Sequence, residues 1–204
     1  TVRLGIIGCG GIMGHHVRGL VQRREDVHFS WLCDVDPAQI NAKQAIIGTF
    51  QDKPPRRTQK FEDVLDDANV DAVIIATPHH WHAPIALPAL AQGKDVYVEK
   101  PLSHGLEQVD ELIDLCRVNG LVLMVGYNLR FYQPLQALKC ELGKIGRVVG
   151  VRAEVGQYLP DWRPGTDYRQ GVSAREDLGG GAVLELSHEL DYVRWLVGEV
   201  EALS

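Results

Sequence analysis

The sequence of 204 residues lacks the features of a membrane or secreted protein. No apolar run approaches the roughly 20 residues that a membrane-spanning helix needs. The opening TVRLGIIGCG has neither the long apolar centre nor the cleavage-type end of a secretory signal. The four cysteines lie far apart and form no C-x-x-C pair, so neither a zinc knuckle nor a redox pair is expected. We therefore expect a cytoplasmic protein with reduced thiols, no bound metal and no membrane partner.

Long basic runs are also missing. The formal net charge is −6, and the short basic stretches RRED at 23–26 and RRTQK at 56–60 lie among acidic residues. A nucleic-acid partner is therefore not expected, and a DNA-binding regulator is the least favoured class because no basic helix is present. With 45% hydrophobic and 24% charged residues, the composition fits one large or two small globular domains.

Strand-like and helix-like segments alternate from residue 2 to about residue 128. Dense apolar runs predict strands at 2–8, 27–34, 70–78, 94–100 and 121–128. Apolar residues at helical spacing predict helices at 14–26, 38–47, 61–67, 82–93 and 106–120. This order predicts an α/β protein whose first domain, residues 1–128, is a Rossmann domain with a doubly wound parallel sheet.

The remaining residues, 129–204, predict the first part of a C-terminal α/β open-sheet domain. Residues 134–146 and 182–198 have helical spacing, and residues 147–159 alternate as a strand does. One strand and two helices do not complete a sheet. We therefore expect a truncated substrate domain whose uncovered sheet favours a homo-oligomer.

A glycine-rich turn joins the first predicted strand to the first helix, in the sequence GIIGCGGIMGHH. The fit to G-x-G-x-x-G is imperfect, because Met13 holds the third glycine position and Gly14 follows it. The turn still allows a tight bend and a close approach of backbone to a pyrophosphate at a helix N-terminus. The expected pyrophosphate-binding residues are Gly8, Gly10, Gly11, Ile12 and Met13.

Asp34 ends the second predicted strand, about 20 residues after the glycine turn. A carboxylate at this place accepts hydrogen bonds from the adenosine ribose and repels a 2′-phosphate. No Arg or Lys follows it closely, so NAD is favoured over NADP as cofactor. The alternative is a plain tight turn in which Asp34 caps the next helix.

Two further segments, ATPHHWH at 76–82 and VEKPLS at 98–103, are predicted at the carboxyl edge of the sheet. Ligands in such folds bind outside the carboxyl ends of the strands, which places Lys100 within reach of a substrate. Taken alone, Lys100 is better explained as an ordinary exposed lysine at a strand end.

The combination of motifs resembles the Gfo/Idh/MocA family of NAD(P)-dependent oxidoreductases. The motifs are GCGGIMG, the strand-end Asp34, ATP followed by His82, EKP, and GGG followed by an acid and a histidine. The resemblance implies an N-terminal Rossmann domain, a C-terminal domain that carries the substrate face, and Lys100 beside the nicotinamide. It also implies a cis bond between Lys100 and Pro101. The strand-end residues that it places against the cofactor are Thr77, Pro78, His82, Glu99 and Lys100.

In the predicted last helix, Glu185, His188 and Asp191 recur every three residues and so share one side. Without the resemblance, His188 reads as a surface histidine paired with an acid. With it, His188 is the acid/base, because a neutral imidazole can take the proton of a secondary alcohol. Lys100 is the electrostatic partner of the developing alkoxide, and Asp191 or Glu185 orients the imidazole. Glu185 matches the family only approximately, since the acid there usually precedes the histidine by four residues.

Polar and aromatic residues in YNLRFYQ at 127–133 and in the loop YLPDWRPGTDYR at 158–169 predict the substrate class. They suit a sugar, a cyclitol or a nucleotide sugar, and the loop and SHELDYVRWL are similar to a family branch of bacterial polysaccharide and amino-sugar synthesis. The alternative for the loop is packing over the core. The alternative for the whole chain is a non-catalytic or weakly active dinucleotide-binding module, a sensor or subunit. The candidate substrate-binding residues are Tyr127, Asn128, Arg130, Trp162 and Arg163.

Overall fold

The computed structural model describes residues 1–162 and 164–202. Arg163, one of the predicted substrate-binding residues, therefore lies outside the described residues. The chain divides into two compact units, Thr1–Val125 and Gly126–Ser204, and each is described by itself. No helix among the described residues is long and apolar enough to cross a membrane.

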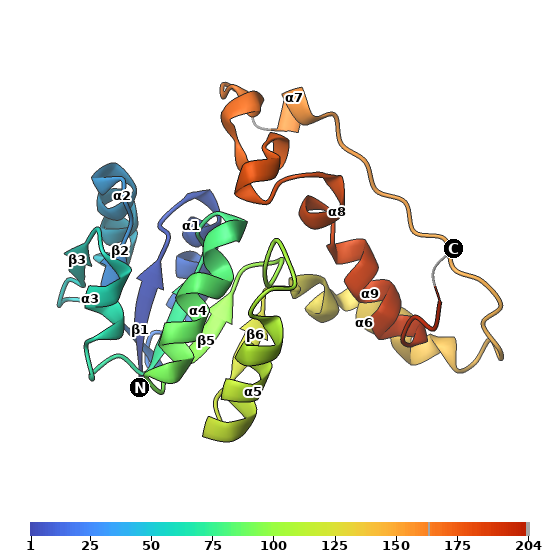
Figure 1. The fold of residues 1–204 in the computed structure, drawn as a ribbon, viewed down its shortest axis with the longest axis horizontal. Helices are drawn as coiled ribbons and strands as arrows, with labels where there is room; N and C mark the ends of the chain where they lie inside the picture. Colours follow the sequence, from blue (N-terminus) through green and yellow to red (C-terminus); the bar gives the residue numbers. More distant parts are fainter. Residues whose placement is uncertain (163, 203–204) are drawn as a thin grey trace. The chain divides into compact units, whose positions relative to one another are not determined.

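The first unit is built on one parallel sheet of six strands (Figure 1). The strands follow the order β3-β2-β1-β4-β5-β6, and every neighbouring pair is parallel. This is the strand order of the Rossmann fold, so the predicted fold class is confirmed. The strands are β1 (Val2–Ile7), β2 (Val27–Cys33), β3 (Arg56–Thr58), β4 (Ala72–Ile75), β5 (Asp95–Val98) and β6 (Leu123–Val125).

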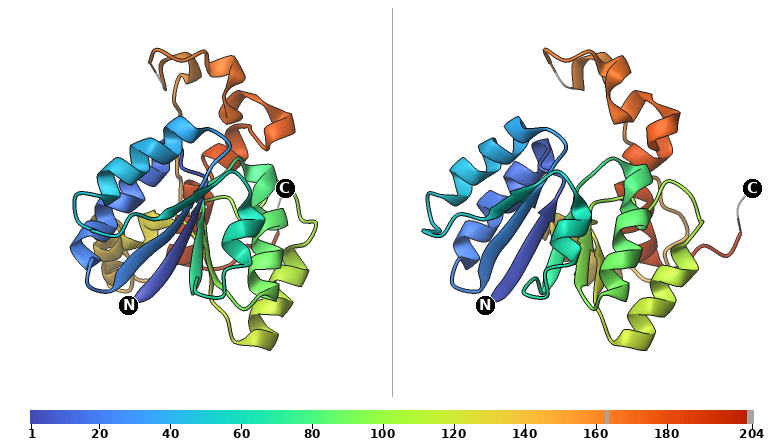
Figure 2. Two further views of the ribbon diagram at one scale, coloured as in Figure 1. Left: turned by 90° about the vertical axis from the view of Figure 1, so that its left-hand side faces the viewer. Right: turned by 60° about the vertical axis from the view of Figure 1, so that its left-hand side comes forward.

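Helices cover both faces of this sheet (Figure 2). They are α1 (Gly11–Leu20), α2 (Pro37–Ile47), α3 (Phe61–Leu65), α4 (His82–Ala91) and α5 (Val109–Asn119). Strand β1 shows why both faces need cover, because Ile6 packs into one buried apolar cluster and Ile7 into the other. The first cluster includes Met13, Val17, Ile40 and Ile47 of α1 and α2. The second includes Val64, Ile85, Leu90 and Leu112 of α3, α4 and α5.

Strand β3 is not among the strands that the sequence predicts. Arg56, Arg57 and Thr58 pair with Trp31, Leu32 and Cys33 of β2. The strand is short, polar and at the sheet edge. The strand forms because it pairs with β2, and its own sequence has no apolar pattern that would predict it.

The second unit is mainly helical and differs from the prediction in two places. Its longer elements are α6 (Gln133–Leu142), α7 (Leu159–Trp162), α8 (Ala182–Glu185) and α9 (His188–Val197). The strand predicted at 147–159 is wrong, because residues 148–158 have no assigned secondary structure. A strand needs a partner ladder, and no described segment pairs with this one. The helix predicted at 182–198 is also wrong as one piece, because it breaks at Leu186, where φ is −105° and ψ is 31°.

The side chain of Lys94, the residue before β5, contacts the turn between α3 and β4. Its side chain is buried, and Nζ donates hydrogen bonds to the carbonyl oxygens of Asp67 at 2.9 Å and Val70 at 3.0 Å. Burial lowers the pKa of Lys94, and the nearby carboxylates of Asp67 and Asp71 oppose that change only in part. The ammonium therefore closes the turn that leads from α3 into β4.

Replacing Lys94 with methionine keeps the apolar stem and removes the donors. The buried Val70 carbonyl then loses the Lys94 donor, and the half-buried Asp67 carbonyl keeps only the Val70 N–H, so the free energy of unfolding should fall by about 1–3 kcal/mol. Urea unfolding followed by circular dichroism measures this change. The matched control is Lys53→Met at an exposed position, with an expected change under about 0.5 kcal/mol. Equal stabilities of Lys94→Met and the unchanged protein would show that these contacts contribute nothing.

Candidate functional site

The glycine turn lies at the carboxyl edge of the sheet, where β1 passes into α1. Gly8 has a φ of +93°, and a Cβ on it would lie 2.5 Å from the backbone carbonyl group of Ala76 and 2.8 Å from the nitrogen of Thr77. Only glycine therefore lets this turn pack against the end of β4. A Cβ on Gly10 or Gly11 would meet no described atom within 4 Å, so a ligand can approach the backbone there.

Helix α1 presents its amino end at this turn. Gly10 is the N-cap residue, and no side chain caps the helix among the described residues. The first N–H groups of the helix are thus available to an anion. Ile12 is about half exposed, whereas Met13 is fully buried, so only the backbone of Met13 can take part in binding.

Asp34 follows β2 at the same edge and holds the glycine turn in place. Its carboxylate accepts hydrogen bonds from the backbone N–H of Cys9 at 2.6 Å and of Asp36 at 2.8 Å. The N-cap residue of α2 is Asp36, whose carboxylate accepts from Ala38 N–H at 2.9 Å. The alternative in which Asp34 caps the next helix is therefore wrong.

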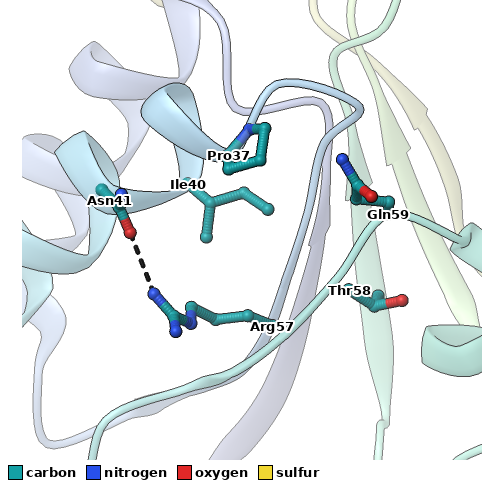
Figure 3. A pocket seen from close by; sticks show the side chains of 6 residues that line it. All are labelled: Pro37, Ile40, Asn41, Arg57, Thr58 and Gln59. Carbon is teal, nitrogen blue, oxygen red and sulfur yellow. Dashed lines mark hydrogen bonds between the residues drawn. The ribbon is translucent and has the colours of Figure 1, made fainter.

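A shallow pocket of about 510 Å³ opens between the start of α2 and the edge strand β3 (Figure 3). Within it, Arg57 Nη1 donates a hydrogen bond to Asn41 Oδ1 at 2.9 Å. The pocket is next to Asp34, since the Asp34 N–H donates to the carbonyl of Thr58 at 3.3 Å. The sequence alone missed this cation because Arg57 follows Asp34 by many residues, and only the pairing of β3 with β2 brings its segment next to the end of β2. The lining residues are Pro37, Ile40, Asn41, Arg57, Thr58 and Gln59.

The segment after β4 carries Thr77, Pro78 and His82. The Thr77 hydroxyl oxygen is buried and has no hydrogen-bond partner among the described residues. His82 is fully buried, and its ring nitrogens lie 2.9 Å from the carbonyl oxygen of Thr77 and 2.7 Å from that of Pro101. Burial is the main cause that lowers the pKa of His82. The ring therefore holds two loops together. Its side chain is fully buried, so it is not exposed for the predicted contact with the cofactor.

The EKP segment follows β5. The bond between Lys100 and Pro101 is cis, as the resemblance implied. Glu99 Oε1 lies 2.6 Å from His16 Nε2 of α1, and the side chain of Glu99 is largely buried. Burial acts to raise the pKa of Glu99, but the hydrogen bond and charge of His16, together with the backbone N–H and charge of Lys100, outweigh it and leave the pKa lowered. Sequence reasoning missed His16, because nothing local pairs it with a residue in another element.

The described residues fit a dinucleotide at this edge. Gly8 provides a turn that a Cβ would fill, Gly10 and Gly11 leave the backbone open, and Thr77 has an unpartnered hydroxyl. Asp34 supplies the carboxylate for a ribose. The same carboxylate also accepts hydrogen bonds from two backbone N–H groups.

In the second unit, Tyr127 and Arg130 pack against the start of α9. The Tyr127 and His188 rings lie 5.8 Å apart, edge to face, and the Tyr127 hydroxyl is 3.4 Å from Ser187 Oγ. Arg130 forms a bidentate pair with the buried Asp191, at 2.8 and 2.6 Å, and this hydrogen bonding raises the pKa of Arg130. Asp191 thus orients Arg130, which the sequence analysis had not assigned to it.

The remaining predicted residues of the second unit lie on separate elements. Glu185 ends α8, one helix before the one that His188 begins, so the predicted shared helix side does not exist. Asn128 begins the 3-10 turn η3 (Asn128–Phe131), and Trp162 ends α7.

Comparison with known families matches both units. Residues 2–127 match the Gfo/Idh/MocA model described as "Oxidoreductase family, NAD-binding Rossmann fold". Residues 139–204 match the model described as "GFO/IDH/MocA C-terminal domain".

Among curated relatives, levoglucosan dehydrogenase of Pseudarthrobacter phenanthrenivorans is 32% identical over 151 residues, which are 72% of this chain and 38% of the relative. The scyllo-inositol 2-dehydrogenase (NAD(+)) of Bacillus subtilis is 28% identical and covers 100% of this chain and 56% of its own length. Among solved structures, the WlbA dehydrogenase of Bordetella pertussis, in complex with NADH and UDP-GlcNAcA, is similar with a TM-score of 0.78 and 25% identity. That match covers 98% of this chain and 56% of the other.

The chain spans about half the length of these relatives, or less. Its glycine turn, strand order and EKP segment all lie within the matched residues. The chain therefore belongs to the Gfo/Idh/MocA family of oxidoreductases.

Proposed function

We propose that the chain acts in an NAD-dependent oxidoreductase that transfers hydride between nicotinamide and a secondary hydroxyl of a sugar, cyclitol or nucleotide sugar. The observation that best supports this proposal is the order of functional groups along the carboxyl edge of the sheet. Asp34 follows β2, Gly8 follows β1, Thr77 follows β4 and Lys100 follows β5, and these four strands are neighbours in that order. With neighbouring strands about 4.8 Å apart, the row spans roughly 14 Å. It presents a ribose acceptor, an anion turn and a cation in the sequence that a dinucleotide requires.

Lys100 and His188 take the two roles at the reacting centre. When bound, the nicotinamide ring accepts or donates the hydride. The Lys100 ammonium stabilises the negative charge that develops on the substrate oxygen, and the His188 imidazole holds the proton that leaves the hydroxyl. His188 begins α9, in the second unit, so the reaction needs both units.

The substrate class rests on the polar residues around the start of α9. Tyr127 and Arg130 lie against this helix, and the Arg130 side chain is still 42% exposed beside Asp191. A hydroxyl-rich ring with an acidic substituent suits an exposed guanidinium whose fork is already oriented. The named relatives act on sugars and cyclitols, which favours the same class for this chain. Asn128, Trp162 and Arg163 remain predicted contacts, and Glu185 a predicted member of the site.

A second candidate function is a dinucleotide-binding module without turnover of its own. It is favoured by residues 148–158, which are extended without a partner strand among the described residues, with Val149 94% exposed. A homo-oligomer that pairs this segment would supply the missing neighbour. Cytoplasmic location and such an oligomer stay predictions.

Lys100→Met and His188→Ala test the catalytic assignment. Each should lower kcat by at least about a hundredfold, while the affinity for NADH changes by less than about threefold. Absorbance at 340 nm with NAD and a panel of sugars, cyclitols and nucleotide sugars gives kcat, and titration calorimetry gives the affinity. Lys60→Met, at an exposed position, is the matched control. Near-normal turnover in either variant overturns the assignment. NADH binding by the unchanged protein without turnover of any panel member supports the module instead.

Asp34→Asn tests the basis of the cofactor preference. The amide removes the charge that repels a 2′-phosphate, and its single oxygen can accept from only one of the two N–H groups, those of Cys9 and Asp36, that the carboxylate accepts from. A general loss of affinity from this change would affect both cofactors and leave their ratio unaltered. With Arg57 in the adjacent pocket, the ratio of NADPH to NADH affinity should rise by about tenfold or more, as expected for losing roughly 1–4 kcal/mol of repulsion. Calorimetric titration of both cofactors measures the ratio. A ratio that stays constant would place the discrimination elsewhere.

A further inference from the structure

Each of the two residues that flank Lys100 is held by a histidine from another element. Glu99 precedes Lys100 and contacts His16 of α1, and Pro101 follows Lys100 and contacts His82, the first residue of α4. We call these four residues, His16, Glu99, Pro101 and His82, the histidine bracket. Its contacts hold the residues on both sides of Lys100 in place.

The His16 side of the bracket is a partly buried ionisable pair. His16 Nε2 lies 2.6 Å from Glu99 Oε1, with side chains only 24% and 14% exposed. The other carboxylate oxygen accepts the backbone N–H of Lys100 at 3.3 Å. The Tyr97 ring packs edge to face on His16 at 5.2 Å, so the imidazole has little freedom to turn. A hydrogen bond to a charged group in such surroundings is stronger than a neutral one.

The His82 side of the bracket fixes the turn after Lys100. The fully buried ring lies against the carbonyl oxygen of Pro101 at 2.7 Å and that of Thr77 at 2.9 Å. It thereby joins the loop after β4, which carries the unpartnered Thr77 hydroxyl, to the loop after β5. A neutral imidazole carries a single N–H, so the ring donates to only one of these two carbonyl oxygens and packs against the other.

The His16 side joins different parts of the site. His16 lies in the second turn of α1, the helix whose amino end forms the anion turn with Gly10 and Gly11. A helix is stiff over so short a length, so the place of α1 and the place of Glu99 are mechanically linked. The Glu99 carboxylate also accepts a hydrogen bond from the backbone N–H of Lys100, so the position of α1 is coupled to the Lys100 backbone.

We propose that His16 is a positioning residue, which uses the Glu99 carboxylate to set Lys100 relative to the dinucleotide-binding helix. This proposal rests on the proposed function, because Lys100 matters only if hydride transfer occurs beside it. A misplacement of about 1 Å can cost about a hundredfold in rate, so the link has kinetic consequences although His16 touches neither substrate nor reacting atoms.

The test compares three single variants of the full chain. His16→Leu fills similar space and removes the donor. His16→Gln places an amide nitrogen near the position of the imidazole Nε2 and keeps it. His15→Leu changes the exposed neighbour on the same helix and is the matched control. For each variant, kcat is measured with the best substrate of the unchanged protein, the affinity for ADP-ribose by calorimetry, and deuterium uptake on the peptide spanning 96–103 by mass spectrometry.

His16→Leu should lower kcat by about tenfold to a hundredfold, with ADP-ribose affinity within about threefold and faster deuterium uptake at 96–103. His16→Gln should recover most of kcat and of the protection, and His15→Leu should match the unchanged protein. An unaltered kcat and uptake in His16→Leu overturns the proposal. An equal loss of kcat and ADP-ribose affinity also overturns it, because it would show general damage to α1. If the unchanged protein turns over nothing, the proposed function fails, and deuterium uptake alone then decides whether the bracket holds Lys100.

Discussion

The site depends on the close approach of the β1 turn to the end of β4. Gly8 makes this approach possible, because any Cβ would overlap the Ala76 carbonyl. The contact brings the anion turn beside Thr77, and the Gly8 N–H reaches in the other direction to the carbonyl of Cys33 in β2. The Asp34 carboxylate accepts a hydrogen bond from the Cys9 N–H and so stabilises the turn. A side chain at this one position would therefore disturb three strand ends at once.

Elements with their own apolar pattern could be predicted from the sequence, and elements that depend on distant partners could not. The runs that became β1 and β4 carry branched apolar residues on both faces, and those that became β2 and β5 are mostly apolar or aromatic. Strand β3 is polar and exists through pairing with β2. The segment 147–159 shows the reverse case, because it alternates like a strand but finds no partner among the described residues. Alternation favours a strand, and only a neighbour makes one.

The same division holds for the candidate site. Gly8, Asp34 and Lys100 could be proposed as site residues from the sequence, because strand ends and glycine turns have local signatures. The pairs His16–Glu99 and Arg130–Asp191 join residues 83 and 61 positions apart, and no local pattern links their members. Helical spacing also suggested a shared side for Glu185 and His188, which the backbone break at Leu186 removes. Long-range ion pairs and helix breaks are decided by packing, so they appear only in the folded chain.

The two units differ in how far their own contacts determine the chemistry. In the first, Lys100 is held on both sides by contacts within that unit, and the cofactor residues lie on neighbouring strand ends. In the second, Arg130 and Asp191 satisfy each other, whereas Val149, Val151 and Val155 stay about half to almost fully exposed on the unpaired segment. Dinucleotide binding and lysine placement therefore follow from the first unit alone. In the proposed function, turnover additionally requires that the second unit bring His188 to the reacting hydroxyl. Pairing of the segment 148–158 would then have to come from contacts beyond those of the described residues.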